Sequence, residues 1–499
     1  MVESFLTLET FRKGISNFLK AKQFGNAKNS EMWEALTKAG HEDRRIPLDI
    51  TVKDFIDTWT YQAGYPVTTV AKSEENFVKL NQNRFFINPK VSSNLTWIIP
   101  ISIVYPMSDR ADFNKISASQ WMSKSYLDIE LTERPYIINI QQSGFYRVNY
   151  DLRNWKDLAK VLKNDHTKIH LLNRAQIIED SFHLVKANQL DYQIALSLTE
   201  YLFEETEFIP WQAAFRSFSF FDLMLNDAST QTEYNHFKEY VIYLLTPLYN
   251  RLGFYNRQED SQFTILYRKS ILNWMCKYGY KDAVNQAKAM FALWMRNPST
   301  NQIDINLLEI VYITAIREGG ETEWNFLWER FLKSSDQFEK QKLIYALGAS
   351  TEQQLIIKYL DYTLSGNFQS EDLAYMYESI GAFPTGQQVQ FEWMETNWAK
   401  LKAKFQQQQF EESVYYMITG YATSANTQTE LSRLENFLQE KSSELSSLNT
   451  DLNMKLKTAK QNMELTKDSN SSVSNWLKSQ VEIFGPEILG KNCELIINY

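Results

Sequence analysis

The chain has 499 residues, a formal net charge of −8, 44% hydrophobic residues and 14% aromatic residues. This apolar content excludes global disorder and fits two to four domains of roughly 100–200 residues each. The acidic balance and the absence of a clustered Lys/Arg stripe argue against nucleic acid as a partner. The chain has only two cysteines, Cys276 and Cys493, a count that gives no disulfide framework. They could pair only if folding brought their Cα atoms within about 7 Å.

Signals for targeting are few. The segment that follows Met1 is acidic and amphipathic, which is not the pattern of a signal peptide. No run of 18 apolar residues predicts a membrane span, and the tail 481–499 lacks a GPI-attachment pattern. Sequons at Asn94 and Asn470 would be glycosylated only in a secreted protein. On these signals alone, a cytoplasmic location stays open for the chain.

Residues 1–66 show helical spacing of apolar residues and predict three short helices. Gly25 and Asn26 indicate the end of the first helix, and Thr51–Asp54 resembles a capping box that starts the third. Three short helices cannot bury all of their large apolar residues against one another, so we expect an exposed apolar patch. The stripes consist of Phe5, Leu8, Phe11, Phe18, Trp33, Phe55 and Trp59.

Between residues 67 and 150 the apolar period changes to two, and turn-forming residues separate short segments. This pattern predicts a small β-sandwich. In the stretch Gly144–Asp151, Tyr146, Val148 and Tyr150 should share one face of a strand. Asp151 and Asn154 should then form a turn or cap before a helix that begins at about Trp155. The clearest strands are predicted at 85–87, 97–103, 127–131 and 136–140.

Residues 151–499 carry helical periodicity almost throughout. The succession predicts stacked antiparallel helix pairs in a HEAT/armadillo-like α-α solenoid, so the fold class is mainly α with a small β-sandwich. A polar segment at 442–467 predicts a late helix, and 481–499 receives no assignment. Representative helices are predicted at 175–187, 192–202, 283–294 and 323–331.

Four stretches resemble the M1 family of zinc aminopeptidases, in particular the aminopeptidase N branch, and they occur in the order found in that family. The resemblance implies that 1–66 are the last helices of a thermolysin-like catalytic domain. It also implies a β-sandwich domain over 67–150 and an endoplasmic-reticulum-aminopeptidase-like C-terminal superhelix over 151–499. The stretches are Trp59–Val67, Gly144–Asp151, Leu172–Asp180 and Glu318–Phe326.

The family's reaction is the zinc-dependent removal of N-terminal amino acids from peptides, and the resemblance makes this chain the wall and lid of the substrate chamber. His-Glu-x-x-His and Gly-x-Met-Glu-Asn, which carry the family's zinc site and amine recognition, are absent from residues 1–499. The spaced pair His166 and His170 lacks the Glu and is interpreted as polar surface residues. We therefore assign no catalytic, metal or cofactor residue, and we expect the chain to be inactive by itself.

Polar residues in two motifs have a functional and a structural interpretation. Asn173, Arg174 and Asp180 could face the chamber, but buried capping and ion pairing is the favoured interpretation. Glu321, Glu323 and Asn325 are interpreted as the start of a helix. Core packing is similarly favoured over substrate contact for the aromatic cluster of Trp211, Phe215, Phe218, Phe220 and Phe221.

Two further expectations concern single positions. Arg147, at the end of the β segment, predicts an ion pair or carbonyl clamp across a domain boundary. The family resemblance places an Arg that reaches the chamber at Thr423 or Ser424, so no substrate-binding residue is carried over.

As partners the resemblance implies peptides in the helical bowl, the family's N-terminal and catalytic domains, and a homodimer. It also implies an intact protein that is extracellular or anchored at the cell surface. The alternative function is a standalone, non-catalytic helical solenoid that binds peptides or proteins. The coding sequence upstream of Met1 would distinguish the two, because only the enzyme requires an upstream His-Glu-x-x-His.

Overall fold

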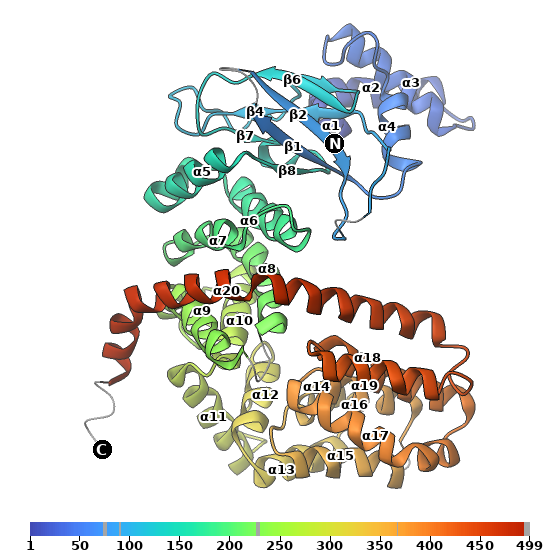
Figure 1. Ribbon diagram of the computed structural model, residues 1–499, viewed down its shortest axis with the longest axis vertical. Coiled ribbons are helices and arrows are strands. Elements are labelled where there is room, and N and C mark those ends of the chain that lie inside the picture. The colour runs from blue at the N-terminus through green and yellow to red at the C-terminus, as the bar shows by residue number, and fades with distance from the viewer. Residues whose placement is uncertain (73–76, 89–90, 226–229, 367, 494–499) are drawn as a thin grey trace. The chain divides into compact units, whose positions relative to one another are not determined.

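The computed structural model describes residues 1–72, 77–88, 91–225, 230–366 and 368–493, with side chains at all of these positions except Lys72, Ser370, 465–471 and 485–493. The described chain is mainly helical (Figure 1). It divides into two compact units, Met1–Phe220 and Phe221–Tyr499, here called unit 1 and unit 2. The predicted boundaries at 66 and 150 both lie inside unit 1 and stay predictions.

Unit 1 begins with four helices, α1 (Val2–Leu6), α2 (Leu8–Ala21), α3 (Asn29–Glu42) and α4 (Val52–Thr60). The predicted capping box is confirmed at α4, since the Thr51 hydroxyl accepts from the Asp54 N–H at 3.0 Å and the Asp54 carboxylate accepts from the Thr51 N–H at 3.3 Å. Phe5 and Phe55 are buried in one cluster, and both rings contact Trp121 of the β segment edge to face. Part of the predicted apolar stripe is therefore covered by the strands that follow it in the chain.

The β segment of unit 1 contains a four-stranded sheet in the order β6-β2-β1-β8 and two two-stranded sheets, β3-β5 and β4-β7, among the described residues. Strand β1 pairs antiparallel with β2 and parallel with β8, where Val67 lies opposite Arg147. The strands are β1 (Pro66–Lys72), β2 (Phe77–Arg84), β3 (Ile99–Ile101), β4 (Ile103–Val104), β5 (Gln120–Met122), β6 (Tyr126–Glu130), β7 (Ile137–Ile138) and β8 (Arg147–Asn149).

Three predicted strands differ from the structure. The one expected at 97–103 is divided at Ser102 into β3 and β4, which belong to different sheets. The strand expected at 85–87 is wrong, because β2 ends at Arg84, opposite Pro66. Strand β1 begins only at Pro66, after a turn at Gly64 with φ 90°, so β2 has no regular partner beyond the bond from the Phe85 N–H to the Tyr65 carbonyl at 2.9 Å. The strand expected at 136–140 is shorter, because Asn139 adopts a left-handed conformation with φ 69° and turns the chain after β7.

The alternation predicted around β8 is confirmed. Tyr146, Val148 and Tyr150 are buried, whereas the side chain of Phe145 is 62% exposed. The Asp151 carboxylate then accepts from the Asn154 N–H at 3.1 Å and caps helix α5 (Leu152–Asp165). The junction from strand to helix therefore follows local sequence rules.

The rest of unit 1 contains η2 (His166–Lys168), α6 (Leu171–Lys186), α7 (Tyr192–Ser197) and η3 (Glu200–Phe203). The single helix expected over 192–202 is wrong, because α7 ends at Ser197. The Ser197 and Thr199 hydroxyls donate to the carbonyls of Ile194 and Leu196 at 2.8 and 2.7 Å. Hydroxyl side chains that bond to nearby backbone compete with helix continuation. Helix α8 (Phe208–Leu225) follows, and the division between the two units falls within it.

Unit 2 is built from helices in which α10, α12, α14 and α16 each pack on the next even-numbered helix. The segment expected to be helical at 442–467 begins later and runs further, as α20. The helices are α9 (Gln231–Leu252), α10 (Gln262–Lys277), α11 (Lys281–Arg296), α12 (Leu308–Glu318), α13 (Glu321–Lys333), α14 (Gln337–Leu347), α15 (Gln353–Ser365), α16 (Ser370–Gly381), α17 (Pro384–Lys404), α18 (Gln407–Ser424), α19 (Gln428–Glu440) and α20 (Asn449–Cys493).

Helix α20 packs on α18 and α19 in its first part and on α9 further along, as Figure 1 shows. Near its far end, Trp476 contacts Tyr240 edge to face and Phe484 stacks on Tyr243 with ring centroids 4.1 Å apart. The unassigned tail 481–499 is therefore helical up to Cys493, and 494–499 lie outside the described residues. In the described part of the chain, no helix has both the length and the apolar composition needed to cross a membrane.

Candidate functional site

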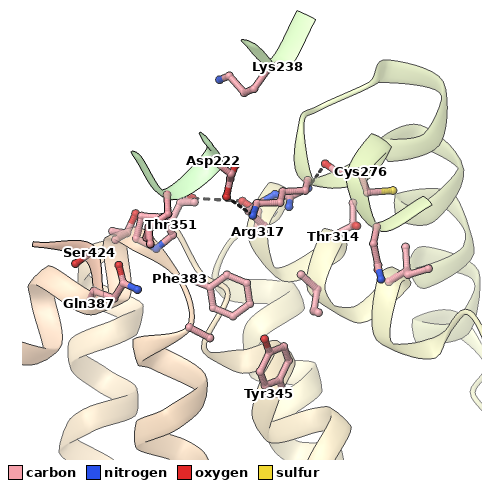
Figure 2. A pocket seen from close by; sticks show the side chains of 18 of the residues that line it. Asp222, Lys238, Cys276, Thr314, Arg317, Tyr345, Thr351, Phe383, Gln387 and Ser424 are labelled. Carbon is pink, nitrogen blue, oxygen red and sulfur yellow. Dashed lines mark hydrogen bonds and ion pairs between the residues drawn. The ribbon is translucent and has the colours of Figure 1, made fainter. Parts of the chain in front are cut away.

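A cavity of about 630 Å³ lies among the helices of unit 2 and is here called the unit 2 cavity. This volume is in the range of small-molecule and peptide side-chain pockets. The wall combines apolar and polar side chains from helices far apart in the sequence (Figure 2). It consists of Asp222, Leu223, Tyr234, Lys238, Asn273, Cys276, Lys277, Glu309, Ile310, Ile313, Thr314, Arg317, Tyr345, Thr351, Ala382, Phe383, Pro384, Thr385, Gln387 and Ser424.

Asp222, on α8, is the most heavily bonded carboxylate of this wall. It accepts from the Lys277 ammonium at 2.6 Å and from the hydroxyls of Tyr234 and Tyr278 at 2.9 Å each. Burial raises the pKa of both tyrosine hydroxyls, and the neighbouring carboxylate raises it further. Both tyrosines therefore remain hydrogen-bond donors, and the charge of Asp222 is compensated within the wall.

Arg317, on α12, forms hydrogen bonds with residues of α10, of α12 and of the segment after α14. Its guanidinium donates to the Cys276 carbonyl and, through Nε, to Glu318 at 3.0 Å, while the Thr351 hydroxyl donates to the Arg317 carbonyl at 3.3 Å. Figure 2 shows Arg317 beside Asp222 and Cys276. The Cys276 thiol is free, and burial raises its pKa to about 11, so it is not a reactive nucleophile at neutral pH.

Of the positions discussed from the family pattern, Ser424 lies in the wall of the unit 2 cavity, at the end of α18. Its neighbour Thr423 is exposed. A Ser at this position offers one hydroxyl, whereas an Arg would have added a charge and five donors. The polar character of this part of the wall therefore comes from Ser424, Gln387 and Thr385.

The three polar residues of α6 are buried inside unit 1. Asn173 donates to the Asn139 carbonyl at 3.1 Å and accepts from the Gln141 N–H at 2.8 Å. Arg174 pairs with Glu205 at 2.6 Å. These contacts tie α6 to the turn after β7 and to the segment before α8.

Asp180, also on α6, pairs with Arg147 of β8 at 2.9 Å, and its second oxygen accepts from the Val148 N–H at 3.0 Å. The ion pair predicted for Arg147 therefore exists, with Asp180 as its partner. Burial raises the pKa of Asp180 to about 6, although Arg147 and the Val148 N–H act in the opposite direction. At neutral pH the carboxylate is ionised and the pair is charged.

A second cavity, of about 540 Å³, adjoins this pair in unit 1 and is lined by Met1, Tyr65, Glu179 and 142–147. Arg147 contributes a cationic side chain to its wall. The central guanidinium carbon of Arg147 lies 5.5 Å from the centre of the Tyr65 ring. The charge of Arg147 is already shared with Asp180, so its guanidinium is not an uncompensated cation in this wall.

The two histidines that sequence spacing singled out do not lie on one helical face. His166 begins η2, and His170 is the N-cap of α6, where its Nδ1 accepts from the Leu172 N–H at 3.3 Å. Burial and Arg174 lower the pKa of His170. Across the described residues, no group of three or more His, Cys, Asp or Glu side chains is arranged to hold a metal ion. The described residues therefore do not fit the zinc site of the family.

The remaining predicted positions make contacts within their own units. Glu323 accepts from the Gly320 N–H at 3.0 Å at the start of α13, and Lys358 donates to Glu321 and Asn325 at 3.0 and 2.9 Å. In the aromatic cluster Trp211, Phe215, Phe218 and Phe221 are buried, and Phe220 is half-buried. Asn94 is exposed, whereas the side chains of Asn470 and Cys493 lie outside the described residues.

Sequence reasoning missed the charged residues of the unit 2 cavity. Asp222, Lys238, Lys277 and Arg317 belong to no motif with a fixed spacing, and they come from four helices. The available signals were weak: Asp222 follows the aromatic cluster directly, and Arg317 comes just before Gly319-Gly320. Only helix packing brings these side chains to one wall.

The fold and this cavity define a mainly helical protein with a ligand-sized pocket between its helices. A family model described as "ERAP1-like C-terminal domain" matches residues 135–461. Aminopeptidase N of Canis lupus familiaris is 32% identical over 504 residues, which cover 96% of this chain and 49% of the relative. Aminopeptidase N of Plutella xylostella is 35% identical over 362 residues, covering 70% and 37%, and glutamyl aminopeptidase of Bos taurus is 30% identical over 486 residues, covering 95% and 48%.

The chain belongs to the M1 family of zinc aminopeptidases and corresponds to their C-terminal portion. It spans about half the length of the curated relatives it matches. The resemblance seen in the sequence motifs is thereby confirmed.

Proposed function

We propose that this chain forms the wall and lid of the substrate chamber in an M1 aminopeptidase that removes N-terminal amino acids from peptides. The observation that carries the proposal is the unit 2 cavity, which is enclosed by helices from α8 to α18. Relatives that cover nearly all of this chain are named aminopeptidases. We therefore infer that peptides, the substrates of such enzymes, bind in this cavity.

The chemistry of the wall suits a peptide. Tyr345 and Phe383 offer apolar and aromatic surface to side chains. The side-chain oxygens of Thr351, Gln387 and Ser424 offer acceptors to peptide N–H groups, because these residues already donate to backbone carbonyls of the protein. Mixed walls of this kind bind a backbone without selecting one side chain. We infer that the cavity accommodates peptides of varied sequence.

We further propose that the sheets between residues 66 and 149 form the β-sandwich of the family and that the helices from α5 onward form its α-α solenoid. The solenoid is supported by the packing in unit 2, where each even-numbered helix from α10 to α16 packs on the next even-numbered helix. Partners would then be peptides, the zinc-bearing region of the family and a second copy of the chain. The intact protein would lie outside the cell or at its surface.

The zinc-bearing region would be supplied from outside residues 1–499, which contain neither His-Glu-x-x-His nor Gly-x-Met-Glu-Asn. The coding sequence upstream of Met1 tests this part of the proposal. An open reading frame that encodes His-Glu-x-x-His supports the chamber role. A frame without that motif would instead favour a non-catalytic binding module.

Peptide binding tests the role of the cavity directly. A fluorescein-labelled peptide with a free N-terminus is titrated with the purified chain, and the fluorescence anisotropy is recorded. Ser424→Trp places a large ring in the cavity wall and should weaken binding, whereas Thr423→Trp, at the exposed neighbouring position, should not. Absence of binding to the unmodified chain, or equal loss in both variants, would contradict the proposal.

A further inference from the structure

Lys238 differs from the other cations of the unit 2 cavity in its surroundings. It projects from α9 into the wall, half-buried, and its ammonium lies 4.7 Å from the centre of the Tyr234 ring. Figure 2 shows Lys238 apart from the group formed by Asp222, Arg317 and Cys276. Its nearest recorded partner is therefore an aromatic face rather than an anion.

The carboxylate that could have paired with Lys238 is already engaged. Asp222 accepts from the Lys277 ammonium at 2.6 Å and from two tyrosine hydroxyls at 2.9 Å. The other carboxylate of the wall, Glu309, pairs with Lys269 at 2.7 Å. Within the part of the chain that the structure describes, Lys238 has neither an ion pair within 4.0 Å nor a hydrogen bond.

Burial lowers the pKa of Lys238, and the more distant charges of Asp222 and Glu239 only partly oppose this effect. A larger fraction of its amine is therefore neutral near pH 7 than at a fully solvated lysine. A neutral amine that lines a pocket is the form that attacks carbonyl carbons.

We propose that Lys238 is a nucleophilic site within the unit 2 cavity, at which uncharged aldehydes are captured reversibly as imines. The Nζ lone pair adds to the aldehyde carbon and, after proton transfer from nitrogen to oxygen, gives a carbinolamine. Loss of one water then forms the C=N bond, and addition of water reverses the reaction. No oxidant, reductant or metal takes part.

The rest of the wall favours an aldehyde with an apolar or aromatic body, because Tyr345, Phe383 and Pro384 face the same cavity. The other nucleophiles of the wall are less suitable. The Lys277 amine is held by Asp222, and the raised pKa of Cys276, at about 11, leaves little thiolate. This site goes beyond the peptide-binding role and does not depend on it.

Reductive trapping of the whole chain tests the proposal. The protein is incubated with benzaldehyde and sodium cyanoborohydride at pH 7, and benzylation of each lysine is followed over time by peptide mass spectrometry. Lys277 is the matched control, since it lines the same cavity and its side chain is 49% exposed, whereas Lys238 is half-buried. Labelling that follows exposure alone would favour Lys277.

We expect Lys238 to be labelled at least about threefold faster than Lys277 and the exposed Lys281, because its amine is partly desolvated and has no anionic partner among the described residues. Lys238→Arg should remove this fast adduct, whereas Lys281→Met, at an exposed lysine outside the cavity wall, should leave it in place. Labelling of Lys238 at or below the rate of Lys277 would overturn the proposal. Since the main comparison uses the unmodified chain, misfolding of a variant cannot hide that result, and peptide anisotropy measured on the same sample reports the proposed function separately.

Discussion

Arg147 joins strand β8 to helix α6 through its charge and its planar face. The guanidinium pairs with Asp180 at 2.9 Å, and Nε donates to the Tyr65 hydroxyl at 3.2 Å. The side chains of the pair are only 11% and 2% exposed. Solvent therefore screens the pair only weakly.

Arg147→Ala should lower the free energy of unfolding by about 3–5 kcal/mol, because it leaves the buried Asp180 carboxylate without its cation. Arg153→Ala is the matched control. Its ion pair with Asp157 is long, at 3.8 Å, and its side chain is 78% exposed, so we expect a loss below about 1 kcal/mol. Urea unfolding followed by circular dichroism measures both. An unchanged midpoint for Arg147→Ala would show that the joint does not depend on the pair.

His183 lies on α6, three residues after Asp180, and should make the free energy of unfolding depend on pH. Its Nδ1 bonds with the Glu179 carbonyl at 2.8 Å, and burial together with the charges of Arg147 and Lys186 lowers its pKa from 6.5 to about 4. Between these two values the unfolded chain binds the proton and the folded chain does not. The free energy of unfolding contributed by this group is therefore lost as the pH falls from 6.5 to 4.

His183→Gln should remove about 1–3 kcal/mol of this pH dependence, since a neutral amide does not titrate. Urea unfolding at several pH values in this interval gives the slope. Equal slopes for the unmodified chain and His183→Gln would contradict the prediction.

Among the elements, the contact between the end of α16 and the start of α17 leaves no room for a side chain. A Cβ built at Gly386 would lie 2.1 Å from the carbonyl oxygen of Ile380. Gly386→Ala should therefore destabilise the chain by about 1–3 kcal/mol through overpacking, although alanine favours a helix. Neighbouring Pro384 and Gln387 line the unit 2 cavity, so peptide binding should weaken as well.

Gly25→Ala is the matched control for Gly386→Ala. The nearest atom to a Cβ at Gly25 is the Lys22 carbonyl oxygen at 3.5 Å, an ordinary contact. We expect its free energy of unfolding to change by less than about 0.5 kcal/mol. Equal effects of the two substitutions in urea unfolding would contradict the prediction. They would mean that the contact between α16 and α17 adjusts to the added methyl group without a loss of stability.

Helices α1 to α4 differ in how closely they pack on the rest of unit 1. The Trp59 indole N–H donates to the Ile98 carbonyl at 3.1 Å, and Phe5 packs on Trp121, so α1 and α4 are tied to the strands. In contrast, Leu19 is 60% exposed and Phe24 is 100% exposed near the end of α2. Large apolar residues in such positions mark a docking surface or an aggregation liability.

Residues 1–66 should be the least protected part of the isolated chain, with the first proteolytic cut near Gly25-Asn26. Gly40 is buried within α3, so cleavage at Gly40-His41 should come later. Limited proteolysis with mass spectrometry locates the cuts, and co-expression with the zinc-bearing region of a relative should suppress them. Equal amide exchange protection of 1–66 and 67–150 would show instead that the segment is self-sufficient.

For the whole molecule, we expect no chelator-sensitive hydrolysis of Leu or Ala chromogenic amides by residues 1–499 alone. The reason is chemical: the sequence provides neither the paired histidines with a glutamate nor the amine-holding glutamate that the family uses. An assay with and without a zinc chelator tests this, with a full-length aminopeptidase N as the positive control. Hydrolysis that the chelator abolishes would contradict the proposed division of labour.

Local features of the sequence determined the local features of the protein. The alternation at Tyr146, Val148 and Tyr150, the cap at Asp151 and the capping box at Thr51 depend only on neighbouring residues, and all three are as predicted. The order of the family motifs likewise determined the family. Periodicity and capping act over a few residues, so a single sequence is sufficient to reveal them.

Tertiary structure decided the features that depend on distant residues. Strand β2 ends at Arg84 because its partner β1 begins at Pro66, after the turn at Gly64. Asp180 pairs with Arg147 on a strand that ends 31 residues earlier, at Asn149. The unit 2 cavity draws its wall from Asp222 to Ser424. Helix packing sets which carboxylate pairs with which cation there. For that reason the sequence could not reveal that Lys238 has no anionic partner among the described residues.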